Sequence, residues 1–259
     1  MTATTSQRVT LEIADGVARL SLANPGRRNA IDLAFLKDFA AAALDIQSDA
    51  SVRVIVMRAD GPVFSVGGDL AEMVANRDRA ERHVLEMAST FHLGIERLQL
   101  SPAPLIVALG GTAAGGGFSL VLGADLVIAG QSAKLVSAYL NSGLTPDGGA
   151  TYFLPRLVGR QKAFEIMALS PVLTAQDALA LGLVTRVVDD AALDEEVMRV
   201  ATKLAALPSD ALSVLKRQLH ASPANGLADQ LAIEAGGIAR AAGRPEVQAA
   251  LDAFFAKAK

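Results

Sequence analysis

The residues best placed to do chemistry are the glycines that follow a short apolar run. Leu105 to Leu109 has the length of a buried strand and follows the breaker Pro104, and Gly115-Gly-Gly117 leads into the start of a helix near Phe118. A strand that turns through glycines into a helix leaves backbone N–H groups unpaired at the helix N-terminus, where the peptide dipoles also point positive. This stretch therefore predicts a place that holds negative charge.

The spacing of the glycines can be compared with the known motifs that bind negatively charged groups. A dinucleotide fingerprint needs glycines as G-x-G-x-x-G, and no register of this stretch supplies all three. A P-loop needs Lys and then Ser or Thr after the last glycine, where Gly117 and Phe118 stand instead. Two interpretations stay open at this point. One is an oxyanion hole, in which backbone donors stabilise a charge that forms during reaction, and the other is tight strand–helix packing that needs glycine.

Length and composition restrict the class of protein. The chain has 259 residues, of which 51% are apolar and 20% charged, which suits one large folded domain or a domain with a small appendage. The near balance of 24 Lys and Arg against 27 Asp and Glu argues against a nucleic-acid-binding surface. The absence of cysteine excludes disulfides, thiolate metal ligands and a cysteine nucleophile. A polar start and no run of about 18 apolar residues predict a soluble, cytoplasmic protein that does not act at a membrane.

The elements expected to position the glycines alternate between strands and helices. In chain order, we expect a hairpin over 9–22 that turns at Asp15-Gly16, a helix over 32–47 with Asp32 as its N-cap, a strand over 52–57, and helices from 70 and over 77–99. We then expect a strand over 105–109, a helix from 118, a strand over 126–129 and a helix over 151–169 interrupted at Pro155 and Gly159. The last elements expected before Leu193 are a helix over 174–182, which opens with a capping box of Thr174 and Asp177, and a strand over 184–188. After Leu193 we expect helices only, broken at Pro208, at Pro223-Ala-Asn-Gly226 and at Gly243-Arg-Pro245. This order predicts an α/β core, residues 1–192, and a helical C-terminal region, residues 193–259.

Two strand–glycine–helix turns, Phe64-Ser-Val-Gly-Gly-Asp-Leu70 and Ala113-Ala-Gly-Gly-Gly-Phe118, together resemble the crotonase superfamily, also called the enoyl-CoA hydratase/isomerase family. Further similar stretches, in the same order as in the family, are Asn24-Pro-Gly-Arg-Arg-Asn-Ala-Ile31, Gly123-Ala-Asp125, Leu144-Thr-Pro-Asp-Gly-Gly149, Leu154-Pro-Arg-Leu-Val-Gly159, Thr174-Ala-Gln-Asp-Ala178 and Gly182-Leu-Val184. The resemblance covers nearly the whole chain. It implies a crotonase-like spiral of ββα units with a helical C-terminal region that builds trimers, often paired into hexamers.

The resemblance also implies an acyl-CoA thioester as the substrate. In the family, two backbone N–H groups hold the thioester oxygen as it becomes an enolate, and those donors fall on Gly68 and Gly116. No metal or redox cofactor is needed, and coenzyme A is part of the substrate. The other residues expected to bind substrate are Arg28, Ala30, Val66, Asp69, Leu70, Ser119 and Tyr139.

The acid–base residues depart from the hydratase pattern. The two catalytic glutamates of hydratases fall on Ser119 and Tyr139, and neither can act as a carboxylate base. Asp147, in Thr145-Pro-Asp-Gly-Gly149, is the replacement candidate. Crotonase-fold isomerases, including the type that acts on ring-derived acyl-CoA in the phenylacetate pathway, resemble this chain here. Pro-Asp-Gly is also an ordinary turn sequence, so an aspartate that only caps the turn stays an alternative.

A single carboxylate favours an enoyl-CoA isomerase, because moving a double bond needs one base that removes a proton and returns it farther along. The alternatives are a hydratase with an altered active site, thioester hydrolysis or dehalogenation, and an acyl-CoA-binding protein that has lost its chemistry. His83, His92 and His220 lack metal-ligand spacing, and we expect solvated or locally bonded histidines there.

Overall fold

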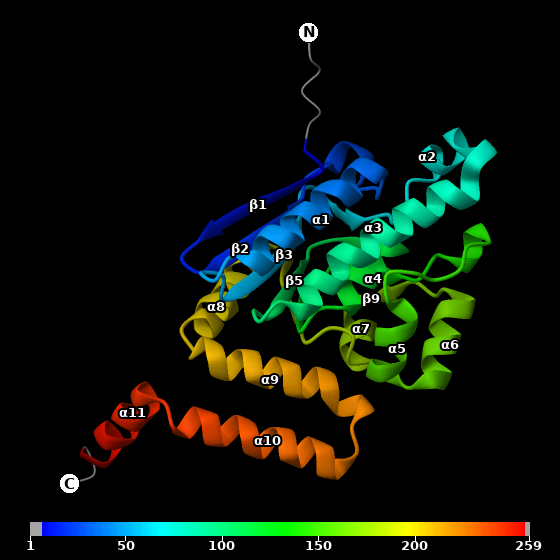
Figure 1. Cartoon of the computed structure of the whole chain (residues 1–259). Helices are drawn as coiled ribbons and strands as arrows, with labels where there is room; N and C mark the ends of the chain where they lie inside the picture. Colours follow the sequence, from blue (N-terminus) through cyan, green and yellow to red (C-terminus); the bar gives the residue numbers. More distant parts are fainter. Residues whose placement is uncertain (1–6, 257–259) are drawn as a thin grey trace. The chain divides into compact units, whose positions relative to one another are not determined.

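The computed structural model describes residues 7–256. The chain divides after Ala206 into two compact units. Figure 1 traces both, and each is described separately below.

The larger unit holds two sheets. The main sheet has the strand order β1-β2-β3-β5-β7-β10, antiparallel between β1 and β2 and parallel elsewhere. Its strands are β1 (Val9–Ala14), β2 (Val17–Leu22), β3 (Val54–Ala59), β5 (Leu105–Leu109), β7 (Leu126–Gly130) and β10 (Arg186–Val188). The smaller sheet has the order β4-β6-β8-β9, and its strands are β4 (Val63–Ser65), β6 (Thr112–Ala114), β8 (Lys134–Val136) and β9 (Leu173–Thr174).

The central strands of the main sheet are buried on both faces. In β3, Ile55 and Met57 join one core cluster, and the alternating Val54 and Val56 join a second cluster on the other face. Such strands have nearly continuous apolar sequences rather than an alternating pattern, as expected for a parallel sheet covered on both sides. The strand expected at 105–109 is confirmed as β5 for the same reason.

Helices α1 (Leu33–Ser48) and α3 (Ala80–Leu100) lie side by side over the first face (Figure 1). Asp32 caps α1 as expected, with Oδ1 accepting from the N–H of Phe35 at 2.7 Å. The Phe39 ring packs against Phe91 of α3, with ring centroids 6.0 Å apart. This contact fixes α3, whose buried face also lines the site described below.

The second face is covered by α8 (Leu193–Ala205). Val197, Val200 and Ala201 of α8 join the core cluster of Val54 and Val56. The larger unit therefore runs to Ala206, whereas the sequence placed the end of the core at residue 192. The reason is that an amphipathic helix belongs to the sheet that buries its apolar face, which helical periodicity alone does not identify.

The main glycine turn differs from the expected one in its strand. The chain leaves β5 at Leu109, crosses to the smaller sheet and forms β6 (Thr112–Ala114) before the glycines. Helix α4 (Gly116–Leu122) then begins after Gly115, and every residue of α4 is buried. The turn is therefore β6–Gly115–α4, and a three-residue strand is too short to stand out in a sequence rich in Gly and Ala.

The remaining helices of the larger unit are α2 (Leu70–Ala75), α5 (Ala150–Val158), α6 (Arg160–Leu169) and α7 (Ala175–Ala180). The break expected at Gly159 is confirmed, but Pro155 lies inside α5 and does not interrupt it. Burial of Ala150 and Leu154 holds α5 together despite the hydrogen bond that the proline removes. The capping box expected at Thr174 and Asp177 is present at the start of α7.

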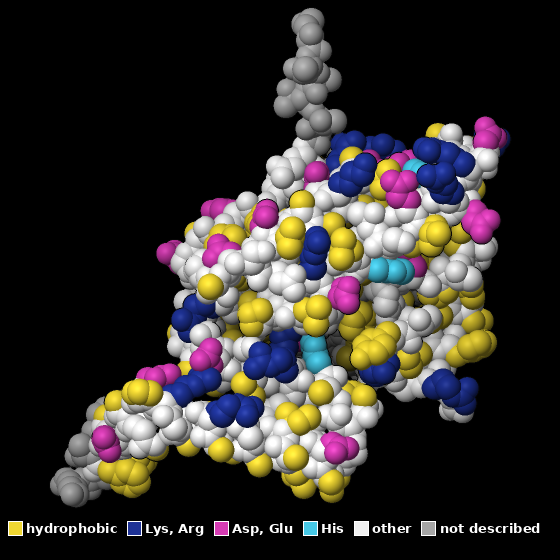
Figure 2. Space-filling model, viewed as in Figure 1, with side chains coloured by type: hydrophobic (Ala, Val, Ile, Leu, Met, Phe, Trp, Pro, Cys, Tyr) yellow, Lys and Arg dark blue, Asp and Glu magenta, His cyan; other side chains and the backbone are white. Residues whose placement is uncertain are grey.

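The C-terminal unit consists of α9 (Ser209–Ala221), α10 (Leu227–Ala242) and α11 (Pro245–Ala256), broken where the sequence predicts. Large apolar side chains are exposed on these helices, and Figure 2 shows them along α10. Examples are Leu219, Leu227, Ile238 and Phe254. Within residues 7–256, no helix is long and apolar enough to cross a membrane.

Candidate active site

A cavity of about 200 Å³ in the larger unit opens between the two glycine turns. Four predicted site residues line it together, and they are Gly68, Gly116, Tyr139 and Asp147. The rest of the lining is mainly apolar and consists of Ile31, Leu36, Met73, Val84, Met87, Ala88, Phe91, Leu144 and Thr145. The site thus combines an apolar pocket with a few polar groups, the usual composition of a small-molecule site.

The N–H of Gly68 is left free by the way its loop is held. Ile31 donates to the carbonyl of Gly67 at 2.8 Å, and Asp69 donates to the carbonyl of Ile31 at 3.0 Å. This parallel bridge uses neither the N–H nor the carbonyl of Gly68, which lies between the two bonds. Among the described residues, the Gly68 N–H has no acceptor in the chain.

The N–H of Gly116 also has no acceptor within residues 7–256, for a different reason. Gly116 is the first residue of α4, and the first N–H groups of a helix have no partner within it. The two loops also touch, because a Cβ at Gly67 would lie 2.8 Å from the carbonyl oxygen of Ala114 and 3.0 Å from the Gly116 nitrogen. Gly67 has φ +83°, so glycine is required there on both counts. Close approach of the two backbones brings both amides to one cavity.

Asp147 is held by two hydroxyl groups. The Tyr139 hydroxyl donates to Asp147 Oδ1 at 2.8 Å. The Ser119 hydroxyl donates to the backbone carbonyl of Asp147 at 3.0 Å, and its oxygen lies 2.7 Å from the Tyr139 hydroxyl. Tyr139 and Ser119 are buried, and Asp147 is half-buried. The two positions that resemble hydratase glutamates therefore hold hydroxyls that contact the candidate base.

Tyr139 stays a hydrogen-bond donor. Burial, and next the negative charge of Asp147, raise the pKa of the Tyr139 phenol above its ordinary value. A phenol in that state is protonated over the whole physiological range, so it donates to the Asp147 carboxylate and cannot act as a base.

The turn after Asp147 is fixed from the opposite side. The Gly148 N–H donates to Nε2 of His92 at 3.1 Å. Gly148 has φ +60°, and a Cβ there would lie 2.6 Å from Cε1 of Phe91 and 2.8 Å from Cβ of Ser119. The turn is thus locked by conformation and by contact, and His92 is bonded to a residue far away in the sequence rather than to a local one.

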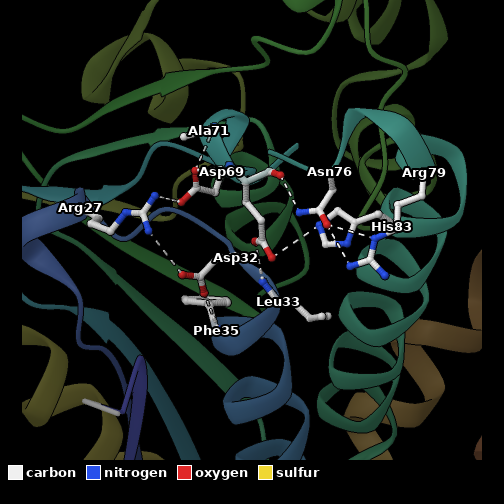
Figure 3. Close-up of polar contacts among 10 residues, drawn as sticks. Arg27, Asp32, Leu33, Phe35, Asp69, Ala71, Asn76, Arg79 and His83 are labelled. Carbon is white, nitrogen blue, oxygen red and sulfur yellow. Dashed lines mark hydrogen bonds and ion pairs between the residues drawn. The ribbon is translucent and has the colours of Figure 1, made fainter. Parts of the chain in front are cut away.

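A charged cluster secures the loop that carries Gly68 (Figure 3). The Arg27 guanidinium forms an ion pair with Asp69 and lies 3.9 Å from Asp32 Oδ2. Asp69 is 4% exposed, and its Oδ1 also caps α2 by accepting from the N–H groups of Ala71 and Glu72. Asp69 is therefore occupied by structural contacts, as its position before a helix suggests.

A second link joins three helices. Glu72 of α2 accepts from the N–H of Leu33 at the start of α1 at 2.9 Å. Its other oxygen lies 3.5 Å from Nε2 of the buried His83 in α3. Met73, the next residue, lines the cavity, so these contacts hold one wall of the pocket.

The other predicted binding residues are not part of the cavity lining, and they are Arg28, Ala30, Val66, Asp69, Leu70 and Ser119. Arg28 is exposed, and its carbonyl accepts from the N–H of Val66. Ala30 is buried, and Leu70 is exposed at the start of α2. Their roles in binding stay predictions.

Sequence reasoning missed the wall that α3 supplies. Val84, Met87, Ala88 and Phe91 all line the cavity. They are spaced as i, i+3, i+4 and i+7, the pattern of one helix face. This spacing predicts a buried face of the helix. It does not predict whether that face covers a pocket or packs into solid core.

Residues 12–259 match the enoyl-CoA hydratase/isomerase family, and the chain belongs to that family of crotonase-fold acyl-CoA enzymes. It is similar to 1,2-epoxyphenylacetyl-CoA isomerase of Escherichia coli (strain K12), with 33% identity over 244 residues, 93% of each chain. It is also similar to 4-chlorobenzoyl coenzyme A dehalogenase-2 of an Arthrobacter species, with 28% identity over 258 residues, 99% of this chain and 94% of the relative.

A crystal structure of an enoyl-CoA hydratase from a Polaromonas species matches with a TM-score of 0.90 and 31% identity, covering 96% of this chain and 97% of that chain. The expected crotonase-like α/β fold is therefore confirmed. These three relatives are named for three different reactions, so the family alone does not select among them.

Proposed function

We propose that this protein is an enoyl-CoA isomerase that uses Asp147 as its single base. The thioester oxygen would bind between the N–H groups of Gly68 and Gly116. Asp147 would take a proton from the carbon next to the thioester, and the electron pair of that C–H bond would pass into a dienolate with its charge on the thioester oxygen. Asp147 would then return the proton to the γ-carbon, which leaves the double bond one position along.

The observation that carries this proposal is the composition of the cavity. Among the residues that line it, Asp147 is the one carboxylate, and it shares the lining with both free amides. Donors fixed before reaction stabilise a developing enolate charge most effectively, because they need no reorganisation. One base and two donors are the complete set of groups that isomerisation needs.

Hydration would need more than the cavity offers. Water must be deprotonated and a proton delivered to carbon, tasks that two carboxylates share in hydratases. Here the corresponding positions are Ser119 and Tyr139, whose hydroxyls point to Asp147. The raised pKa of Tyr139 also argues against its use as a second base.

The size of the cavity supports a compact acyl group. Its volume of about 200 Å³ compares with an engineered apolar cavity of about 150 Å³ that accepts benzene. Phe91, Met73 and Met87 give it an apolar wall that suits a ring-derived or short acyl chain. The relative named for 1,2-epoxyphenylacetyl-CoA favours the ring-derived class.

Two further parts of the proposal concern coenzyme A and assembly. The Arg28 guanidinium forms no ion pair with any described residue and is exposed beside the loop of Val66, which suits a contact to coenzyme A phosphates.

We also propose a homotrimer or hexamer built through the helical region 193–259, since the C-terminal helices expose large apolar side chains.

The test is a panel of acyl-CoA esters that includes straight-chain and ring-derived enoyl groups and one halogenated aryl group. Wild type should shift the double bond, Asp147→Asn should abolish this, and Asp45→Asn, at an exposed site on α1, should have no effect. Hydration by wild type that survives Asp147→Asn would overturn the proposal. Tight binding with no turnover across the panel would indicate a non-catalytic acyl-CoA-binding protein instead.

A further inference from the structure

The hydroxyls of Tyr139 and Ser119 and the carboxylate of Asp147 form a closed cluster, and its protons can be assigned by counting. An ionised carboxylate only accepts, so the Tyr139 hydroxyl must be the donor in the 2.8 Å contact with Asp147 Oδ1. The Ser119 hydroxyl then donates to the Asp147 carbonyl at 3.0 Å, to the Tyr139 oxygen at 2.7 Å or to the Gly115 carbonyl at 3.4 Å. In each case Tyr139 remains the donor in the contact with Asp147 Oδ1.

With this assignment, the two carboxylate oxygens of Asp147 differ in their hydrogen-bond partners. Oδ1 is occupied by Tyr139, whereas Oδ2 accepts no hydrogen bond from any described residue. Asp147 lines the cavity and is half-buried, so Oδ2 is the oxygen left for a substrate proton. From these contacts we infer that Tyr139 and Ser119 are positioning residues that hold Asp147 so that Oδ2 removes and returns the proton. The inference rests on the proposed function.

Helix α4 links this cluster to the oxyanion donors. Gly116 is the first residue of α4, and Ser119 lies one helical turn later on the same helix. Since a helical turn is rigid, the separation between the Gly116 amide and the Asp147 turn is set by the helix rather than by a loop. Phe91 supports the arrangement, because its ring lies close to both Gly116 and Gly148.

The test is Tyr139→Phe, which keeps the ring and removes only the hydroxyl. A hydrogen bond to a charged group contributes about 1.5–3 kcal/mol, so kcat should fall about tenfold to a hundredfold with little change in KM. The acid limb of the pH–rate profile should move to higher pH, because the lost bond favoured the charged, basic form of the carboxylate. Ser119→Ala should have a smaller effect, since Tyr139 still donates to Oδ1.

The chain offers a matched control, because its other tyrosine is the half-exposed Tyr152 of α5. Tyr152→Phe should change neither kcat nor the pH profile. If Tyr139→Phe also leaves both unchanged while Asp147→Asn is inactive, the positioning role is wrong and the proposed function stands. If Asp147→Asn keeps full turnover, the proposed function itself fails.

A spectroscopic measurement covers the case in which Tyr139→Phe does not fold. Both tyrosines are replaced by 3-fluorotyrosine in otherwise wild-type protein, and the Tyr152→Phe variant assigns the remaining ¹⁹F signal to Tyr139. Asp147→Asn should shift that signal, because the acceptor of the phenol changes from a carboxylate to an amide. An unchanged signal would overturn the inference.

Discussion

The amide of Gly116 is a backbone group, so most side-chain substitutions leave it in place. Proline removes the N–H and is tolerated at the first position of a helix, which Gly116 occupies in α4. Loss of one oxyanion donor typically lowers kcat about 10²- to 10³-fold. We therefore predict that Gly116→Pro folds and loses turnover by about that factor, measured as single-turnover isomerisation.

Gly116→Ala is the matched control for this prediction. Its Cβ would lie 2.8 Å from Cδ1 of Ile31, the end of a flexible side chain, and its N–H is kept. The comparison therefore separates the amide from the added volume. Equal turnover in the two folded variants would contradict the oxyanion assignment.

At the residue scale, the sequence predicted the members of the site better than their contacts. Gly68, Gly116, Tyr139 and Asp147 were all expected, and all line one cavity. The hydrogen bond from Tyr139 to Asp147 was not expected, because it depends on how two turns fold toward each other. No local pattern records such a contact between turns.

At the scale of elements, a few charged side chains join the loops that hold the oxyanion donors. Arg27 connects the loop before α1 to Asp69, which is almost fully buried at the start of α2. Removing a cation from a buried carboxylate is destabilising, although the half-exposed Arg27 limits the effect. We predict that Arg27→Leu lowers the free energy of unfolding by about 1–2 kcal/mol, measured by urea denaturation.

For the neighbouring Arg28 we expect an effect on substrate binding and none on stability. Arg28 forms no ion pair with the described residues, so Arg28→Leu should leave the free energy of unfolding unchanged and raise the KM of the coenzyme A ester. A stability loss in Arg28→Leu with none in Arg27→Leu would show that the two roles are reversed.

Secondary-structure features were predicted correctly where they depend on residues that are close together in the sequence. The Asp15-Gly16 hairpin, the Asp32 cap and the Thr174 capping box were predicted and are present, because each depends on neighbouring residues. Strand β6 and the attachment of α8 to the main sheet were not predicted. Both depend on which distant surface buries a short or amphipathic segment.

At the scale of the whole molecule, the exposed apolar side chains of the C-terminal unit point to self-association. Ile238 of α10 is 74% exposed, an unusual exposure for part of an apolar helix face. We predict a trimer or hexamer by sedimentation equilibrium, and a shift toward monomer in Ile238→Glu. Leu44→Glu, at an exposed apolar position on α1, should not change the mass. A wild-type monomer at micromolar concentration would contradict this assembly.

In the proposed isomerase, one carboxylate carries a proton from one carbon of the acyl group to another. The direct measurement uses a β,γ-enoyl-CoA deuterated at the α-carbon, in ordinary water, with the product examined by NMR. Wild type and Asp45→Asn should place part of the deuterium at the γ-carbon of the α,β-enoyl product, and Asp147→Asn should form no product. A β-hydroxyacyl product from wild type, or label transfer that survives Asp147→Asn, would contradict proton transfer by Asp147.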